Sequence, residues 1–287
     1  MKFDLIVVRQ SMLAEYYGAY LWQQQTGSDI MVTSPITKLT EDDLLKIKDK
    51  KILIVGGYYR ENMEPIVKSA KEVSVFYNNS DIDGLTVDYT YYTSRELTGF
   101  LTWTVNQLAL TEPYILQMAQ YLDEYLYGYP TEQALCFQNG VYILEGNNDL
   151  DKILKVKSLS DIEQTIIKGR EKRVNNLRVA QSRLKLAKEY TITFNGCCYE
   201  VLIGIGDTPI VDTCLLLAEK SKMGIGMLLR YDFNLNRTYV STRTTENSGI
   251  DAGNLMKLLI KGGGSKPMGG GSVEGLYFPD QLIKLIS

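Results

Sequence analysis

Apolar and polar positions divide the 287-residue chain into three stretches of different character. In the first, short apolar runs stop at glycine or asparagine and alternate with segments of helical spacing. The predicted strands and helices are Phe3–Val8, Lys51–Val55 and Val73–Phe76, and 61–70, 97–110 and 114–127. Continuous apolar runs of this length are typical of parallel strands that are buried on both faces. Alternation of strands and helices predicts a doubly wound, mainly parallel α/β sheet, with ligands at the carboxyl ends of its strands.

The middle stretch, from Leu150 to Tyr190, is rich in lysine and arginine and keeps its apolar positions at helical spacing. It predicts a helical connector, and the domain limits we expect are 1–148, 149–189 and 190–287. The basic positions of the connector are Lys168, Arg170, Lys172, Arg173, Arg178 and Arg183. Such a face is usually only solvated, and the alternative is that it lines a phosphate-binding cleft between two domains.

The last stretch is rich in β-strand patterns and predicts a smaller, mixed α/β domain. The predicted strands are Thr191–Phe194, Cys197–Ile205, 224–232 and Arg237–Thr244, with helices over Val211–Lys220 and Ile250–Ile260.

Composition excludes several classes of partner. The net charge of −3 and the pI of about 5.3 give no general attraction for long nucleic acid. No run approaches the roughly 20 apolar residues that span a bilayer. The first residues lack the apolar core of a signal peptide, so we expect a cytoplasmic protein without a membrane partner. A homo-oligomer is left open.

The chain contains no histidine, the commonest metal ligand and the commonest general base near neutral pH. Its four cysteines, Cys136, Cys197, Cys198 and Cys214, form no CxxC pair and are expected to be free thiols. We therefore predict no metal site and no cofactor.

The most specific string is KGGGSKPMGGGSVEG, Lys261 to Gly275. One interpretation is a flexible linker. The other is an anion nest, because glycines let backbone N–H groups approach a phosphate without obstruction by a Cβ atom. The position of the string, between a helix and an apolar segment, favours the nest.

With this string the C-terminal third resembles the substrate-binding, DHH-associated domain of the DHH phosphoesterases. That family has a Ser-x-Arg-Ser strand, a helix, and a Gly-Gly-Gly-His motif. Here the strand reads Ser241-Thr242-Arg243-Thr244, the helix is Ile250–Ile260, and Gly262, Gly263 and Gly264 are followed by Ser265 in place of histidine. The resemblance implies that Arg243, these glycines and Ser265 hold a phosphate, and Lys266 adds positive charge beside them.

The N-terminal third is similar to the catalytic domain of the same family, with the metal ligands replaced. The first strand ends at Arg9 where the family has histidine, and the second ends at Gly56 where the family has aspartate. The third is followed by Tyr77, Asn78 and Asn79 in place of Asp-His-His. Asp123 is the remaining counterpart of a metal-binding aspartate.

The residues at the replaced positions suit the binding of a phosphate better than the hydrolysis of a phosphoester. An arginine repels a metal ion but holds phosphate by paired hydrogen bonds, so Arg9 would take over part of the electrostatic role of the metals. Tyr77, Asn78 and Asn79 would add stacking and hydrogen bonds. The alternative is that these positions drifted after the chemistry was lost.

Together these features predict a pseudo-enzyme that binds and sequesters a nucleotide or cyclic (oligo)nucleotide signal in the cleft. A viral protein that disarms host nucleotide signalling is one such setting. The alternative function is a residual metal-dependent phosphodiesterase that uses Asp123, Glu15 and Asp81. A third interpretation is a structural subunit with a vestigial cleft.

Overall fold

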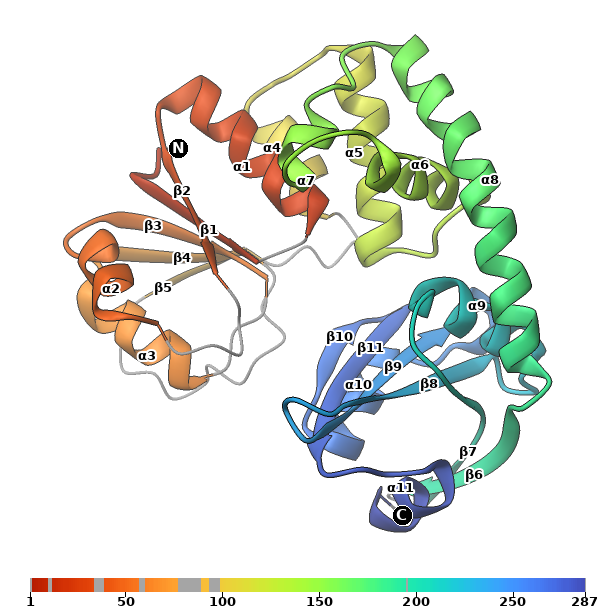
Figure 1. Cartoon of the computed structure of the whole chain (residues 1–287). Coiled ribbons are helices and arrows are strands. Elements are labelled where there is room, and N and C mark those ends of the chain that lie inside the picture. Colours follow the sequence, from red (N-terminus) through yellow and green to blue (C-terminus); the bar gives the residue numbers. More distant parts are fainter. Residues whose placement is uncertain are drawn as a thin grey trace. The chain divides into compact units, whose positions relative to one another are not determined.

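The computed structural model describes residues 2–9, 12–33, 39–56, 60–76, 89–92, 99–194 and 196–286 (Figure 1). The chain divides into two compact units. We call Met1–Leu126 with Pro130–Gly169 the N-terminal unit, and Tyr127–Tyr129 with Arg170–Ser287 the C-terminal unit. No helix in the described ranges has the length and apolar character needed to cross a membrane.

The N-terminal unit is built on a five-stranded parallel sheet with the order β2-β1-β3-β4-β5. The strands are β1 (Leu5–Arg9), β2 (Asp29–Thr33), β3 (Lys51–Val55), β4 (Glu72–Phe76) and β5 (Tyr89–Tyr92). This confirms the predicted α/β class and all three predicted strands, and adds β2 and β5. Because all pairs are parallel, the carboxyl ends of β1 and β3 lie at the same edge.

Seven helices of the described chain precede the long connecting helix. They are α1 (Leu13–Thr26), α2 (Glu41–Ile47), α3 (Arg60–Ser69), α4 (Phe100–Gln107), α5 (Pro113–Tyr127), α6 (Glu132–Ile143) and α7 (Asp149–Ile153). Several begin at a side chain that accepts a backbone N–H, as Thr40 does in a capping box with Asp43. The helix predicted over 97–110 is shorter, because it begins after Gly99. Trp22 and Trp103 pack against each other in this unit.

The helix α8 (Leu159–Leu184) is continuous through Gly169, although glycine has a low helix propensity. A Cβ atom at Gly169 would lie 1.8 Å from the carbonyl oxygen of Cys136 in α6, and one at Gly140 would lie 2.0 Å from that of Thr165. The two glycines therefore let α6 and α8 approach backbone to backbone. The division between the two units falls inside this helix.

The C-terminal unit is a mixed six-stranded sheet with the order β10-β11-β9-β8-β7-β6. Its strands are β6 (Lys188–Phe194), β7 (Cys197–Ile205), β8 (Ile225–Asp232), β9 (Arg237–Thr244), β10 (Gly263–Ser265) and β11 (Met268–Glu274). Its helices are α9 (Ile210–Lys220), α10 (Ala252–Ile260) and α11 (Pro279–Ile286). The predicted mixed α/β domain is confirmed, and β10 and β11 are additional.

The two faces of this sheet differ. Ile225, Met227 and Leu229 of β8 face α10 and belong to the apolar core with Leu255 and Met256. Gly226 faces α9, since a Cβ atom there would lie 2.3 Å from the Ala218 nitrogen. Directly opposed residues of paired strands share a face, so the cross-strand partners of Gly226 lie on the α9 side.

Candidate functional site

Arg9, at the carboxyl end of β1, is held by Glu15 from the first turn of α1. The Arg9 Nε donates to Glu15 Oε1 at 2.8 Å, its Nη2 donates to the same oxygen, and its backbone N–H donates to Oε2 at 3.1 Å. The Glu15 side chain is fully buried and that of Arg9 is 17% exposed. Both carboxylate oxygens of Glu15 therefore accept hydrogen bonds from Arg9, a partner that the sequence did not predict.

Gly56, directly after β3, provides the space in which Arg9 lies. A Cβ atom at residue 56 would lie 2.2 Å from the Arg9 Nε, and the φ angle of Gly56 is +85°. Space and backbone conformation both require glycine here. The guanidinium thus occupies the edge of the sheet where bound ligands are expected in this class of fold.

Asp123 of α5 is a second buried carboxylate near Glu15. It accepts hydrogen bonds from the backbone N–H groups of Thr102 at 2.7 Å and Leu101 at 3.4 Å, at the start of α4. Burial raises the pKa of Asp123 from 3.8 to about 6. The Glu15 carboxylate adds to the rise, and the bonds from Thr102 and Leu101 oppose it. A carboxyl group with this pKa changes its charge close to neutral pH.

Stability should therefore fall as pH rises through the pKa of Asp123. The protonated form is favoured in the fold, so the contribution is complete below pH 3.8 and is lost as pH rises through about 6. Between pH 5 and pH 7.5 the wild type should lose about 1.4 kcal/mol relative to Asp123→Asn. Urea unfolding followed by tryptophan fluorescence measures this difference. Equal pH profiles for the two proteins would contradict the assignment.

Other predicted residues of this unit are not placed. Tyr77, Asn78, Asn79 and Asp81 lie outside the described residues. In the described ranges no three histidine, cysteine, aspartate or glutamate side chains form a group able to hold a metal ion. The ligand-binding roles of Arg9, Tyr77, Asn78 and Asn79 stay predictions.

In the C-terminal unit, Arg243 lies in a cross-strand row on the α9 side of the sheet. Its partners are Gly226 in β8 and Met268 in β11, and Met268 pairs with Ser265 in β10. The side chains of Arg243 and Ser265 are therefore on one face, about two strand spacings or 10 Å apart. Both are buried, and the Ser265 Oγ has no hydrogen-bond partner among the described residues.

The glycine run is a β-hairpin and not the nest of converging N–H groups that the sequence predicts. Gly263 and Gly264 pair with Gly270 and Gly269, and the Gly262 N–H donates to the Met256 carbonyl at 3.0 Å. The linker interpretation is wrong for the same reason, because the run is a paired part of the sheet. Whether Gly262, Gly263 and Gly264 contact a ligand stays a prediction.

The glycines of the hairpin divide between its two faces. Those facing α10 permit close packing: a Cβ atom at Gly269 would lie 2.3 Å from the Ala252 carbonyl oxygen. Gly263 and Gly270 face the other side together with Ser241, so that this face carries only small residues along the hairpin beyond Met268, the cross-strand neighbour of Arg243. Lys266, at the turn, is exposed, and its carbonyl accepts the Ala252 N–H at 2.8 Å.

Sequence reasoning missed Arg230, which lies on the same face two residues beyond Leu228 in β8. It pairs with Tyr239, its guanidinium lies 4.9 Å above that ring, and its Nη1 lies 3.8 Å from an Asp207 carboxylate oxygen. The alternation in β8 that buries Ile225, Met227 and Leu229 assigns Arg230 to the opposite face. Arg243 and Arg230 thus give this face two guanidinium groups.

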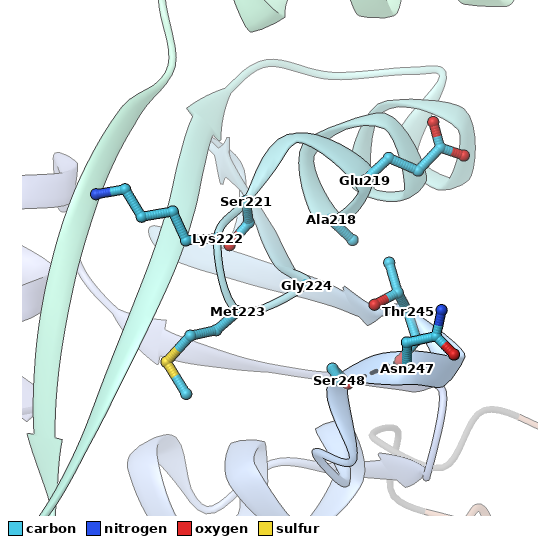
Figure 2. A pocket seen from close by; sticks show the side chains of 9 residues that line it. All are labelled: Ala218, Glu219, Ser221, Lys222, Met223, Gly224, Thr245, Asn247 and Ser248. Atoms are coloured by element: carbon cyan, nitrogen blue, oxygen red, sulfur yellow. Dashed lines mark hydrogen bonds between the residues drawn. The ribbon is translucent and has the colours of Figure 1, made fainter.

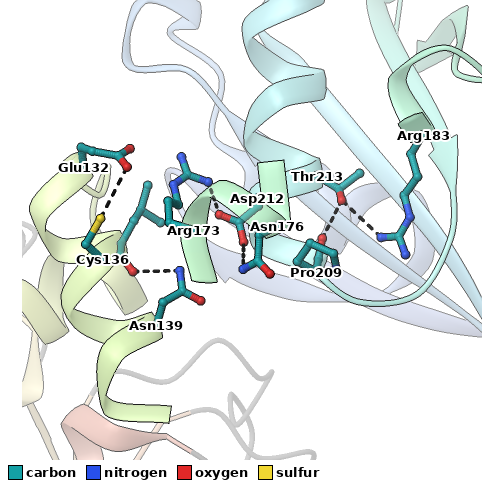
Figure 3. A network of polar contacts seen from close by, with 10 residues as sticks. Glu132, Cys136, Asn139, Arg173, Asn176, Arg183, Pro209, Asp212 and Thr213 are labelled. Atoms are coloured by element: carbon teal, nitrogen blue, oxygen red, sulfur yellow. Dashed lines mark hydrogen bonds and ion pairs between the residues drawn. The ribbon is translucent and has the colours of Figure 1, made fainter. Parts of the chain in front are cut away.

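The connecting helix α8 holds α9, which packs on this side of the sheet (Figure 3). Arg173 forms a buried ion pair with Asp212 of α9, and Asn176 donates to the other oxygen of Asp212 at 2.6 Å. Arg183 donates to the carbonyl oxygens of Asp207 and Thr208, which precede α9. Two of the basic residues predicted to be a solvated face therefore hold α9 and the loop before it.

Cys214, on α9, illustrates the environment of Arg243. Burial raises the pKa of its thiol to about 12, while the positive charges of Arg243 and Arg183 oppose the rise.

Cys136 is also buried, whereas Cys197 and Cys198 are exposed. Two thiols should therefore react with Ellman's reagent at pH 8 in the folded protein and all four in denaturant, because the thiolate is the reactive form. Rapid reaction of a third thiol in the folded protein would contradict this assignment.

An open pocket of about 500 Å³ lies elsewhere, at the C-terminal end of α9 (Figure 2). It is lined by Ala218, Glu219, Ser221, Lys222, Met223, Gly224, Thr245, Asn247 and Ser248. Its one cation and one anion give it no net charge for a phosphate, and neither Arg243 nor Ser265 lines it.

Comparison with known proteins gives structural likeness without sequence similarity. No family model and no curated protein matches the chain. A pGpG-specific phosphodiesterase, PggH, from Vibrio cholerae is 13% identical, with 94% of this chain and 93% of that one covered and a TM-score of 0.43. An exopolyphosphatase-related protein from Bacteroides fragilis is 13% identical, with 99% and 90% covered and a TM-score of 0.49. CDC45 from Entamoeba histolytica is 6% identical, with 99% and 95% covered and a TM-score of 0.42. Likenesses this distant assign no chemistry to the chain.

Proposed function

We propose that this chain is a DHH-like pseudo-enzyme that binds a nucleotide or a short phosphodiester, linear or cyclic, and releases it unchanged. The observation that carries the proposal is the row on the α9 side of the C-terminal sheet. There, the buried Arg243 guanidinium shares a face with the buried Ser265 hydroxyl, which has no hydrogen-bond partner in the described part of the chain. Both groups donate hydrogen bonds, and phosphate oxygens are acceptors that suit each of them.

The surroundings of the row favour a nucleotide over inorganic phosphate. Gly263, Gly270 and Ser241 give this face small residues beyond Met268, and Tyr239 lies along the same strand. Arg230 offers a second cation for a second phosphate. A base or sugar over these small residues, with phosphates held by two arginines, would occupy this arrangement.

Binding without hydrolysis is supported by what occupies the N-terminal edge. The Arg9 guanidinium lies over Gly56, and both oxygens of Glu15 are engaged by Arg9. A divalent ion placed there would meet a fixed positive charge and would have to displace it from Glu15. Sequestration of a nucleotide signal, as in a viral protein directed against host nucleotide signalling, is the role that we propose for such a binder.

Calorimetric titration with cyclic dinucleotides, linear dinucleotides, cyclic oligonucleotides and ADP-ribose derivatives tests the proposal, with each ligand recovered afterwards for chromatography. We expect at least one ligand to bind with a Kd well below 1 mM, about −4 kcal/mol, and to be recovered intact. Binding no tighter than this by any member of the panel would overturn it.

A residual phosphodiesterase is the second candidate, and the two buried carboxylates favour it. Glu15 and Asp123 are close enough that Glu15 raises the pKa of Asp123. Incubation of the same dinucleotides with Mn²⁺ discriminates between the candidates. Product formation that is abolished in Asp123→Ala would support the enzyme, whereas full recovery of the substrate supports the binder.

A further inference from the structure

The outward face of α8 carries two large apolar side chains that are exposed in the described chain. Ile167 is 62% exposed and Val174 is 45% exposed. The opposite face of the helix, in contrast, packs against the rest of the fold: Thr165 and Ala180 are buried, and Arg173 forms an ion pair with Asp212. Two exposed branched side chains one heptad apart form an apolar stripe, which is the pattern of a helix with a missing partner.

The charges around this stripe are arranged about its centre. At about 100° per residue, positions 163, 167, 170, 171, 174 and 178 lie within about 100° of one another around the helix axis. Glu163 and Arg178 are one turn or more outside the apolar pair, and Arg170 and Glu171 lie between its members. All four charged residues are exposed. The sequence of this face therefore reads acid, apolar, base, acid, apolar, base.

That order is complementary to its own reverse. Consider a second copy of α8 that lies antiparallel to the first, with the two-fold axis between residues 170 and 171. Each residue then faces the partner residue that is equally far from the axis on its other side in the numbering. The resulting contacts are Ile167 with the partner's Val174, Glu163 with the partner's Arg178, and Arg170 with the partner's Glu171. Each contact occurs twice, and every charge meets its opposite.

These charges have no competing ion pairs in the described ranges. The Arg178 Nη1 makes only a long hydrogen bond of 3.4 Å to Asn175, and Glu163, Arg170 and Glu171 form no salt bridge there. Other surface charges of the protein do pair, for example Lys68 with Glu64 one turn away on α3. The outward face of α8 is thus an apolar stripe flanked by charged side chains that form no ion pair within the described part of the chain.

We propose that two copies of this chain associate through an antiparallel α8–α8 contact centred between Arg170 and Glu171. A face of about 22 Å along the helix, at 1.5 Å per residue, is a small interface and gives a reversible dimer. The proposal is independent of ligand binding, because none of the six residues belongs to the Arg243 row.

Sedimentation velocity of the full chain, from about 1 to about 100 µM, tests the contact because this range covers weak protein interfaces. The wild type should show a concentration-dependent dimer. Ile167→Glu should raise the dimer Kd at least tenfold, since the charge enters the apolar stripe twice. Val179→Glu is the matched control: Val179 is 41% exposed on the same helix, about 120° from Ile167 around the axis. It should leave the dimer Kd unchanged.

Charge exchange identifies the antiparallel register. Glu163→Arg and Arg178→Glu should each weaken self-association, because each places like charges opposite one another. An equimolar mixture of these two variants should recover the dimer, and so should the double variant Glu163→Arg/Arg178→Glu. A monomeric wild type at the highest concentration, or a dimer that is insensitive to Ile167→Glu, would overturn the proposal. Failure of the mixture to recover the dimer would overturn it as well.

Discussion

Replacing Glu15 by alanine is expected to destabilise the N-terminal unit by about 3–5 kcal/mol, the usual cost of removing one member of a buried ion pair. Glu15 is fully buried and accepts three hydrogen bonds from Arg9. Without it, the guanidinium over Gly56 keeps its charge and loses the buried carboxylate that accepts its hydrogen bonds. The two tryptophans of the chain, Trp22 and Trp103, lie in this unit, so urea unfolding followed by tryptophan fluorescence reports on it selectively.

Two further variants isolate the cause. Glu64→Ala removes an exposed carboxylate that pairs with Lys68 on α3, and should cost less than about 1 kcal/mol. Arg9→Met combined with Glu15→Leu removes both charges and should recover most of the stability, since an apolar pair often replaces a buried ion pair without loss. A loss below about 1 kcal/mol in Glu15→Ala would show that Arg9 does not depend on this partner.

The strands of the N-terminal sheet were predictable where burial alone determines the sequence. The runs at β1, β3 and β4 are apolar at nearly every position because both faces are covered. The strand β2 was missed because it lies at one edge, where Asp29 and Val32 are exposed and the run is not continuously apolar. Sequence pattern thus identifies strands in the centre of a sheet better than strands at its edge.

The glycine hairpin of β10 and β11 could not be predicted from the local sequence pattern. Glycine has low β-propensity, so a run of glycines indicates a loop. Strand β10 forms because its glycines pair with those of β11 and because Gly269 and Gly264 allow α10 to approach the hairpin backbone. That reason depends on a helix packed across the sheet, which no local pattern contains.

The candidate site was predicted in part for the same reason. Arg243 was identified by its place in a strand before a helix and a glycine run, and the structure places it in one row with Ser265. Arg230 was not identified, because only the register of β8 against β9 shows that it shares this face. The pairing of Arg9 with Glu15 was likewise invisible, since it depends on how α1 leaves β1.

Arg243→Ala should lower the affinity for the bound nucleotide by 10- to 100-fold, about 1.5–3 kcal/mol, the usual value of a hydrogen bond to a charged group. The measurement is calorimetric titration of the wild type and the variant with the best ligand of the panel. Ser265→Ala should have a smaller effect, about 0.5–1.5 kcal/mol, because its hydroxyl is neutral. Arg243→Lys keeps the charge but loses the paired donors, so its affinity should lie between wild type and alanine.

Arg237→Ala provides the matched control, because Arg237 is an exposed arginine at the other end of the same strand. Arg237 opposes Glu274 in β11, six residues along β9 from Arg243, and its loss should leave the affinity within twofold of wild type. Circular dichroism of each variant separates a binding defect from loss of the fold. An Arg243→Ala protein that is folded and binds as well as wild type would show that the ligand lies elsewhere. Equal losses in Arg243→Ala and Arg237→Ala would instead indicate attraction by the general charge of β9, without a contact specific to Arg243.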